Sequence, residues 1–127
     1  MSGRVVHFEV PYDDGDSAAK FYGDVFGWQA MPVPEVSYTM VMSGPSGDQG
    51  PTEPGYINGG MFARDPDHSA PNVVIDVDNI EDALTKVTAA GGSTVSERVP
   101  VGEMGFAAYF KDSEGNVVGL WETAASA

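Results

Sequence analysis

The stretch HFEVPYDDGDSAAKFYGDVFG, residues 7–27, decides the fold, because its pattern returns 65 residues later as NVVIDVDNIEDALTKVTAAGG, residues 72–92. Each copy opens with an apolar strand-like segment and continues through a polar turn rich in helix-capping residues. Apolar residues at helical spacing follow, at 18, 22, 25 and 26 in the first copy, which predicts a helix with one buried face. The capping candidates and the closing glycines align without a gap, Asp14 with Asn79 and Gly27 with Gly92, so the chain reads as an internal duplication.

Strand-like segments also follow each predicted helix, so each half reads β-α-β-β-β. They cover residues 37–42 and 56–62 in the first half and 105–110 and 116–122 in the second, with a short strand near 28–30 or 93–95. A sheet with one helix on one face leaves its other face open. We therefore predict an α+β fold of two β-α-β-β-β modules that form a curved mixed sheet, with the helices outside and a concave inner face suited to a small molecule.

The length of 127 residues suits a single domain. Within residues 1–127 we expect a first module at about 4–63, a polar linker at 64–71 that contains two prolines, and a second module at about 72–123. A loop at residues 44–55 is rich in glycine and proline, and it is either a lid or a tolerated insertion.

Charge and composition exclude several functions. The 19 acidic and 6 basic residues give a net charge of −13, which makes nucleic acid and anionic membranes poor partners. Such a surface keeps a protein soluble, and it also attracts cationic small molecules. No apolar run approaches the roughly 18 residues of a membrane helix, and the absence of a secretory signal predicts a cytoplasmic protein. The absence of cysteine excludes disulfides, thiolate catalysis and cysteine-based metal sites.

His7 and Glu9 are the candidate catalytic residues. They lie two positions apart in an apolar strand, so they leave by the same face, opposite to Phe8, and line the inner face. One interpretation is an acid–base pair in which the carboxylate raises the imidazole pKa, and another is a pair that hydrogen-bonds a ligand. The structural alternative is a hydrogen-bonded pair at a dimer interface.

Further ligand-binding candidates follow from strand alternation and from residue type. Tyr109 and Trp121 offer aromatic walls or stacking surfaces. Glycines 59, 60 and 119 weaken their strands, which indicates room for a ligand or another chain close to the sheet. The complete predicted set is Tyr38, Met61, Asn72, Val74, Tyr109, Gly119 and Trp121.

Four motifs extend over nearly the whole chain: HFEVP at 7–11, AAKFYGDVFGW at 18–28, INGGM at 57–61 and DSEGN at 112–116. In this order they resemble the vicinal oxygen chelate superfamily, which includes glyoxalase I, extradiol dioxygenases and the bleomycin and fosfomycin resistance proteins. The amino-acid sequence of these motifs is most similar to that of a bacterial group of single-domain glyoxalase-like proteins.

The resemblance implies a divalent metal in some members, held by ligands from the first and last strands of each module. Carried over, these positions fall on His7, Asn72, Gly119 and either Gly59 or Gly60, so His7 is the one matching ligand. A glycine side chain donates nothing, and one asparagine amide does not replace the missing donors. We therefore predict no cofactor. Glu9, or Glu122 on a bulged last strand, leaves open the alternative of a divalent metal such as Ni, Zn or Mn.

The leading functional hypothesis is a homodimeric glyoxalase-like protein of the resistance or sequestration type, which binds a cationic or aromatic small molecule without a metal. The alternative is a glyoxalase-like lyase, isomerase or epimerase in which His7 and Glu9 move a proton next to a carbonyl, with or without a metal. A third hypothesis is a dimerisation scaffold with a vestigial pocket.

Overall fold

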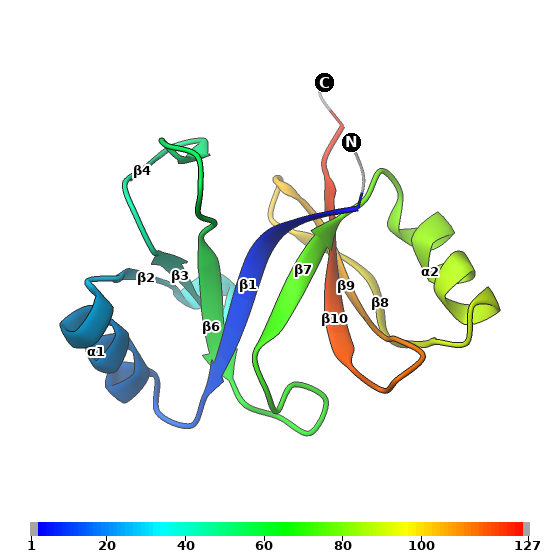
Figure 1. Ribbon diagram of the computed structural model, residues 1–127, viewed down its shortest axis with the longest axis horizontal. Coiled ribbons are helices and arrows are strands. Elements are labelled where there is room, and N and C mark those ends of the chain that lie inside the picture. Colours follow the sequence, from blue (N-terminus) through cyan, green and yellow to red (C-terminus); the bar gives the residue numbers. More distant parts are fainter. Residues whose placement is uncertain (1–2, 126–127) are drawn as a thin grey trace. The chain divides into compact units, whose positions relative to one another are not determined.

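The computed structural model describes residues 3–125, which divide into two compact units. The N-terminal unit comprises residues 7–71, and the C-terminal unit comprises residues 3–6 and 72–125. The N-terminal unit contains β1 (Arg4–Tyr12, from His7 onward), α1 (Gly15–Phe26), β2 (Gln29–Val33), the 3-10 helix η1 (Pro34–Val36), β3 (Tyr38–Met42), β4 (Ser46–Gly47), β5 (Gly50–Pro51) and β6 (Gly59–Ala63) (Figure 1). The C-terminal unit contains β7 (Asn72–Asp76), α2 (Ile80–Ala89), β8 (Ser93–Val101), β9 (Gly105–Lys111) and β10 (Val117–Thr123).

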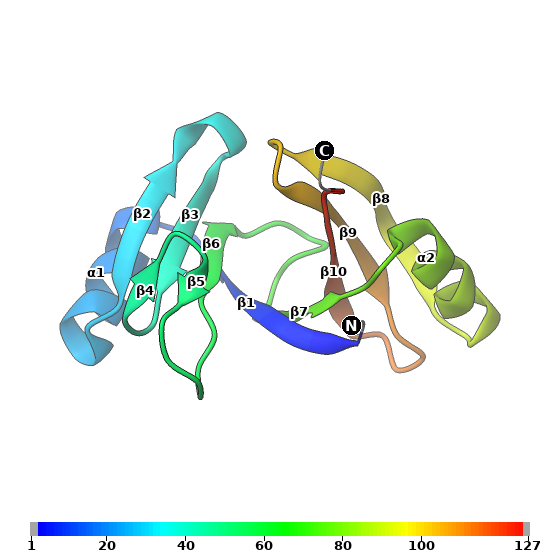
Figure 2. The ribbon, with the colours of Figure 1, turned by 90° about the horizontal axis from the view of Figure 1, so that it is seen from above.

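The two units repeat one strand arrangement. In the N-terminal unit the order is β2-β3-β6-β1, where β1 and β6 are parallel and the other neighbours antiparallel. In the C-terminal unit the order is β8-β9-β10-β7, where β7 and β10 are the parallel pair. The predicted α+β fold of two β-α-β-β-β modules is therefore confirmed, while the exact module boundaries remain a prediction. Strands β4 and β5 form a separate small ribbon within the 44–55 loop (Figure 2).

The helices begin where the duplicated pattern predicts. The side chain of Asp14 accepts a hydrogen bond from the backbone of Ser17 at 3.1 Å, and that of Asn79 accepts one from the backbone of Asp82 at 2.9 Å. Each carboxylate or amide oxygen satisfies a backbone N–H that the first helical turn leaves open. These aligned N-caps show that the repeat extends to the level of single hydrogen bonds.

The helix ends differ. Gly27 closes α1 in the left-handed conformation, with φ of 75°, as predicted. In α2 the C-cap is Ala90 and the left-handed residue is Gly91, with φ of 99°, so the predicted equivalence of Gly92 with Gly27 is wrong. The reason is length, because α1 has 12 residues and α2 has 10.

The hydrophobic core of the C-terminal unit lies between α2 and its sheet. Ile80, Ala108 and Leu120 are at most 3% exposed, and Phe106 and Phe110 pack against them. Because side chains alternate along a strand, the even-numbered residues of β9 and β10 face α2 and the odd-numbered ones face the opposite side. We call this opposite side the open face of the unit.

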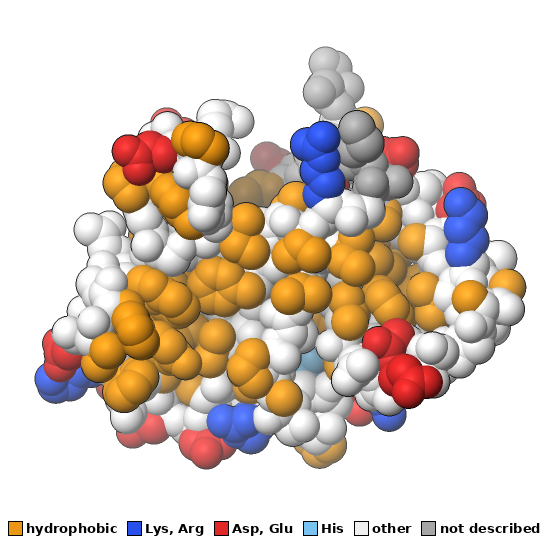
Figure 3. Space-filling view, in the orientation of Figure 1, with side chains coloured by type: hydrophobic (Ala, Val, Ile, Leu, Met, Phe, Trp, Pro, Cys, Tyr) orange, Lys and Arg blue, Asp and Glu red, His pale blue; other side chains and the backbone are white. Residues whose placement is uncertain are grey.

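Helix α1 covers its sheet more loosely. None of its residues is buried, and Phe21, Val25 and Phe26 are 54–61% exposed, so the predicted burial of Val25 and Phe26 is wrong. Figure 3 shows hydrophobic side chains gathered over this helix. The contact to the sheet instead runs through Tyr22, which stacks on Trp28 at 4.7 Å between ring centroids, and Trp28 lies 5.2 Å from Phe8. Between residues 3 and 125, no helix is both long and apolar enough to cross a membrane.

Candidate functional site

A tyrosine hydroxyl joins the two candidate catalytic residues on the open face of the N-terminal unit, the face turned away from α1. Phe8 packs toward α1 through Trp28, so alternation along β1 places His7 and Glu9 on this open face, as predicted. Tyr38, the first residue of β3, donates its hydroxyl proton to Glu9 Oε2 at 2.8 Å. The Tyr38 hydroxyl oxygen also lies 2.7 Å from His7 Nε2. His7, Tyr38 and Glu9 therefore form one hydrogen-bonded group.

The hydrogen bond from Tyr38 to Glu9 determines which nitrogen of the His7 imidazole faces Tyr38 as a donor. A phenol has one proton, and Tyr38 gives it to the buried carboxylate of Glu9, which is 4% exposed. His7 Nε2 must then carry a hydrogen and donate it to the tyrosine oxygen, so that Nδ1 is the basic nitrogen whenever the ring is neutral.

Burial controls the pKa of His7. Desolvation lowers it below the ordinary value of 6.5, and the negative charge of Glu9 raises it by a smaller amount. The carboxylate of Glu9 does raise the imidazole pKa, as expected. The predicted increase in the pKa of His7 is nevertheless wrong, because desolvation lowers it by more. At neutral pH the ring is uncharged, so it is available as a hydrogen-bond donor and as a base.

Gly60 makes this arrangement sterically feasible. It pairs with Glu9 in the β1–β6 ladder, and a Cβ atom at this position would overlap the ring and hydroxyl of Tyr38. The neighbouring Gly59 similarly accommodates Phe8, whose ring carbons would lie 2.6 Å from a Cβ there. We expected Gly59 and Gly60 to leave room for a ligand or another chain close to the sheet. The room exists, but the side chains of Tyr38 and Phe8 fill it.

An aromatic row extends the group along β6. The rings of Tyr38 and Phe62 stack with centroids 6.2 Å apart, and His68 meets Phe62 edge-on at 5.4 Å. Phe62 was missed in the sequence, although alternation from Gly60 points to it. Met61 was chosen instead, and the structure buries it at 1% exposure on the opposite face, away from Tyr38.

In the C-terminal unit, three predicted ligand-binding residues lie side by side on the open face. Gly119 pairs with Val74 on one side and with Tyr109 on the other. A Cβ atom on Gly119 would lie 3.0 Å from Val74 Cγ2 and 3.2 Å from Tyr109 Cε1, so these side chains flank the glycine closely. Trp121 follows two residues later and donates its ring N–H to Thr123 at 3.2 Å.

Asn72 begins β7 and is 9% exposed. Neither its side-chain oxygen nor its nitrogen has a hydrogen-bond partner within residues 3–125. A buried amide in this state is rare in folded proteins, since most buried polar atoms are bonded.

Glu122 has a structural role on the helix side of the C-terminal unit. Its carboxylate accepts two hydrogen bonds from Arg98, at 2.9 and 3.1 Å, and one from the backbone of Ile80 at 2.9 Å, at the start of α2. These bonds hold the pKa of Glu122 below its usual range. The Arg98 guanidinium also lies 3.5 Å above the ring of Phe106. The expectation that Glu122 could turn toward a metal is therefore wrong.

The donor set does not fit a divalent metal. Among residues 3–125 no group of three histidine or carboxylate side chains lies close enough to hold one. The Tyr38 hydroxyl already binds His7 Nε2 and Glu9, and glycines 60 and 119 lie against tyrosine rings. A divalent ion in a protein needs several converging anionic or imidazole donors, which these residues do not supply.

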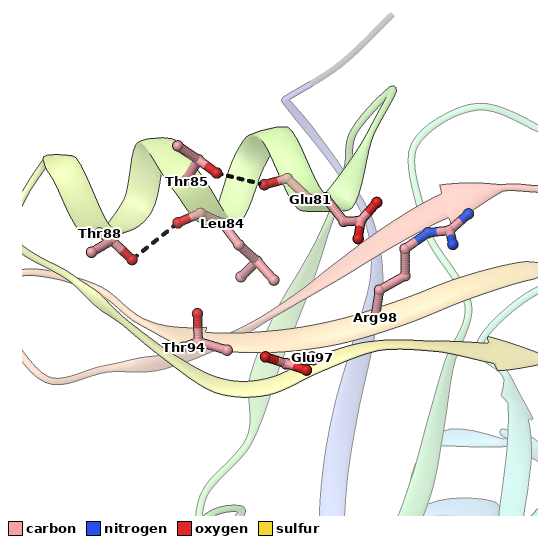
Figure 4. A pocket seen from close by; sticks show the side chains of 7 residues that line it. All are labelled: Glu81, Leu84, Thr85, Thr88, Thr94, Glu97 and Arg98. Carbon is pink, nitrogen blue, oxygen red and sulfur yellow. Dashed lines mark hydrogen bonds between the residues drawn. The ribbon is translucent and has the colours of Figure 1, made fainter.

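The C-terminal unit also has a groove of about 320 Å³ between α2 and β8 (Figure 4). It is lined by Glu81, Leu84, Thr85, Thr88, Thr94, Glu97 and Arg98. The hydroxyls of Thr85 and Thr88 donate to backbone carbonyls of their own helix, and Arg98 is bound to Glu122. These three side chains thus serve the fold, and none of the predicted site residues lies in the groove.

We expect the lowered pKa of His7 to appear as a pH dependence of stability. The unfolded chain binds the His7 proton at higher pH than the folded chain, so the free energy of unfolding falls as pH drops below 6.5. The slope from this one group is at most about 1.4 kcal/mol per pH unit. His7→Gln keeps a donor nitrogen toward Tyr38 but does not titrate, so urea unfolding between pH 8 and 5 should show a shallower decline in the variant. Parallel curves for the two proteins would contradict the expectation.

Comparisons with known proteins agree with this fold. A family described as bleomycin resistance protein-like N-terminal matches residues 4–44. A glyoxylase-like domain-containing protein of Didymella fabae is 30% identical over 121 residues, covering 91% of both chains. A probable lactoylglutathione lyase of Vibrio parahaemolyticus is 30% identical over 124 residues, covering 94% of this chain and 90% of that one.

Solved structures show the same fold. Methylmalonyl-CoA epimerase of Streptomyces coelicolor, in complex with 2-nitronate-propionyl-CoA, superimposes with a TM-score of 0.65 at 14% identity, covering 98% of this chain and 100% of that one. The relatives from Didymella fabae and Vibrio parahaemolyticus align with this chain over nearly its whole length. The chain therefore belongs to the vicinal oxygen chelate superfamily, as one of its glyoxalase-like members.

Proposed function

We propose that this protein binds a small molecule, without a metal, on the open face of its N-terminal unit, as a sequestration or resistance protein does. The observation that carries the proposal is the Tyr38 hydroxyl, which lies within hydrogen-bond distance of both His7 and Glu9. It engages the imidazole nitrogen and the carboxylate oxygen that a metal would otherwise require. The group remains polar and can exchange these hydrogen bonds with a ligand.

Charge supports a cationic ligand. Glu9 brings a carboxylate to the group, while burial keeps the pKa of His7 low and its ring neutral. The stacked rings of Tyr38 and Phe62 provide aromatic surface that attracts a cation. The net charge of −13 favours the approach of cations from solution. An aromatic ammonium compound combines these features.

A paired titration tests the proposal. We expect benzyltrimethylammonium to bind the intact protein, detected by ligand-observed NMR, and to lose at least tenfold in affinity in Glu9→Gln. Calorimetric titration with Ni²⁺, Zn²⁺ and Mn²⁺ should show no stoichiometric binding that depends on His7. Stoichiometric metal binding that disappears in His7→Ala would overturn the metal-free proposal. Failure of the ammonium probe, or equal binding to Glu9→Gln, would overturn the proposed ligand class.

A second candidate function is proton transfer by a lyase, isomerase or epimerase. The neutral His7 imidazole, with Nδ1 unprotonated and Nε2 anchored to Tyr38, is arranged as a base. One relative is named a probable lactoylglutathione lyase, and a structural neighbour is a methylmalonyl-CoA epimerase. Turnover of lactoylglutathione, or deuterium exchange into methylmalonyl-CoA in heavy water, that is lost in His7→Gln would establish this function in place of sequestration.

The predicted homodimer and cytoplasmic location remain predictions. The exposed apolar residues of α1, namely Phe21, Val25 and Phe26, are consistent with a surface that another copy covers. The ligand-binding assignment of Val74, Tyr109, Gly119 and Trp121 also remains a prediction.

A further inference from the structure

Three of the six methionines of the chain lie together on the open face of the N-terminal unit. Met31 in β2 pairs directly with Met40 in β3, and Met42 follows Met40 by two residues. Alternation along β3 places Met40 and Met42 on the same face as Tyr38, whose hydroxyl bonds Glu9 on the open face. Directly paired residues of neighbouring strands also share a face, so Met31 joins them. We call Met31, Met40 and Met42 the methionine cluster.

The register of the two strands allows the sulfur atoms of the cluster to converge. The Cβ atoms of directly paired residues, such as Met31 and Met40, lie about 5 Å apart in an antiparallel ladder. Diagonal neighbours, such as Met31 and Met42, lie about 7–8 Å apart. A methionine side chain is unbranched and has three rotatable bonds, so its sulfur atom can reach across such gaps. The three thioethers can therefore surround one ion without a change in the strands.

The methionine cluster is accessible to solvent. Met31 is 52% exposed, and Met40 and Met42 are partly exposed. Strand β2 is the last strand in the sheet order, so an ion can approach Met31 from the edge of the sheet. A side chain that is half exposed contributes little to a hydrophobic core, so packing alone does not explain the methionine at position 31.

The chemistry of a thioether selects the kind of ion. Its sulfur atom is a soft donor, which favours Cu(I) over hard divalent ions such as Mg²⁺, Ca²⁺ and Mn²⁺. The sequence contains no cysteine, so no thiolate of the chain competes for a soft ion. Three neutral ligands leave the positive charge of the ion in place, and the net charge of −13 favours its approach.

We propose that the methionine cluster binds one Cu(I) ion at the edge of the open face of the N-terminal unit. The site uses thioether sulfurs only, so it requires none of the imidazole and carboxylate donors that a divalent ion at His7 and Glu9 would need. The proposed small molecule binds at the Tyr38 group without this ion. The inference therefore goes beyond the proposed function, and either one can fail without the other.

Silver ion is the probe, because Ag⁺ shares the charge and the soft character of Cu(I) and is stable in air. In protein labelled with methyl-¹³C methionine, one equivalent of Ag⁺ in chloride-free buffer should shift the methyl signals of Met31, Met40 and Met42. Two other methionines serve as internal controls and should not shift: Met61, which is 1% exposed, and Met104, which is 65% exposed in the C-terminal unit. Cu(I) added without oxygen should shift the same three signals. An equal shift of Met104 would show that the ion binds any accessible thioether, and shifts with silver alone would exclude Cu(I); either result would overturn the proposal.

Leucine variants test each thioether, because leucine nearly conserves the volume of methionine and lacks the sulfur. Calorimetric titration with Ag⁺ should show one site in the intact protein and at least tenfold weaker binding in Met31→Leu, Met40→Leu and Met42→Leu. Met104→Leu is the matched control and should bind Ag⁺ as the intact protein does. Undiminished binding in any of the three cluster variants would remove that residue from the site and overturn the proposal, as would the absence of stoichiometric binding to the intact protein.

Discussion

Gly60→Ala is expected to destabilise the protein by about 3 kcal/mol, an effect at the upper end of those caused by overpacking. The added Cβ atom would overlap the Tyr38 ring and hydroxyl, and the backbone of β6 is held in place by β1 and β3 on either side. Tyr38 must therefore leave the position in which it bonds His7 and Glu9. Urea unfolding should show the loss of stability, and benzyltrimethylammonium binding should weaken with it.

The clash can be separated from any general intolerance of alanine in β6. Tyr38→Ala removes the ring that the new methyl would meet, so Gly60→Ala should cost less than about 1 kcal/mol in that background. Gly60 has no left-handed backbone conformation, which means that alanine is compatible with its local geometry. An equal cost in both backgrounds would show that Tyr38 is not the cause.

The duplication made much of the fold predictable, because strand, cap and helix face recur at one offset. Alternation along β1 also sufficed to place His7 and Glu9 on one face, since Phe8 supplied an unambiguous apolar anchor between them. In β6 this anchor was missing. Two adjacent glycines begin the strand. Alternation places Phe62 on the same face as Gly60, but a glycine has no side chain to indicate which face that is, and Met61 was chosen wrongly.

The sequence did not predict that Tyr38 bridges His7 and Glu9. It depends on the side-chain reach of a residue 29 positions from Glu9 and on a glycine in a third strand. The glycines predicted free space, yet what fills that space is decided by tertiary packing, which is a property of several strands together. The same limit applies to the partners of Glu122. Alternation along β10 turns this side chain toward α2, but its bonds to Arg98 and to the backbone of Ile80 depend on tertiary packing.

The hydroxyl of Tyr38 is a single oxygen atom, yet we expect Tyr38→Phe to cost about 2 kcal/mol of stability, as for hydrogen bonds to charged groups. Phenylalanine keeps the ring that stacks on Phe62 and fits over Gly60, so the packing should survive. What disappears is the donor to the buried Glu9 carboxylate and the acceptor for His7 Nε2. Tyr56→Phe, which removes a hydroxyl bonded to Pro45 at an exposed position, is the matched control and should cost about 0.5 kcal/mol or less.

A double-mutant cycle assigns this cost to the hydrogen bond with Glu9. Once Glu9→Gln has removed the charge, deletion of the hydroxyl should cost about 1 kcal/mol less than it does in the wild type. The difference arises because a neutral amide oxygen is a weaker acceptor than a carboxylate and suffers less when left unbonded in a buried site. Additive effects of the two substitutions in urea unfolding would show that Tyr38 and Glu9 act independently. In that case the stability of the group would rest on aromatic stacking, and the hydroxyl would lose its place at the centre of the site.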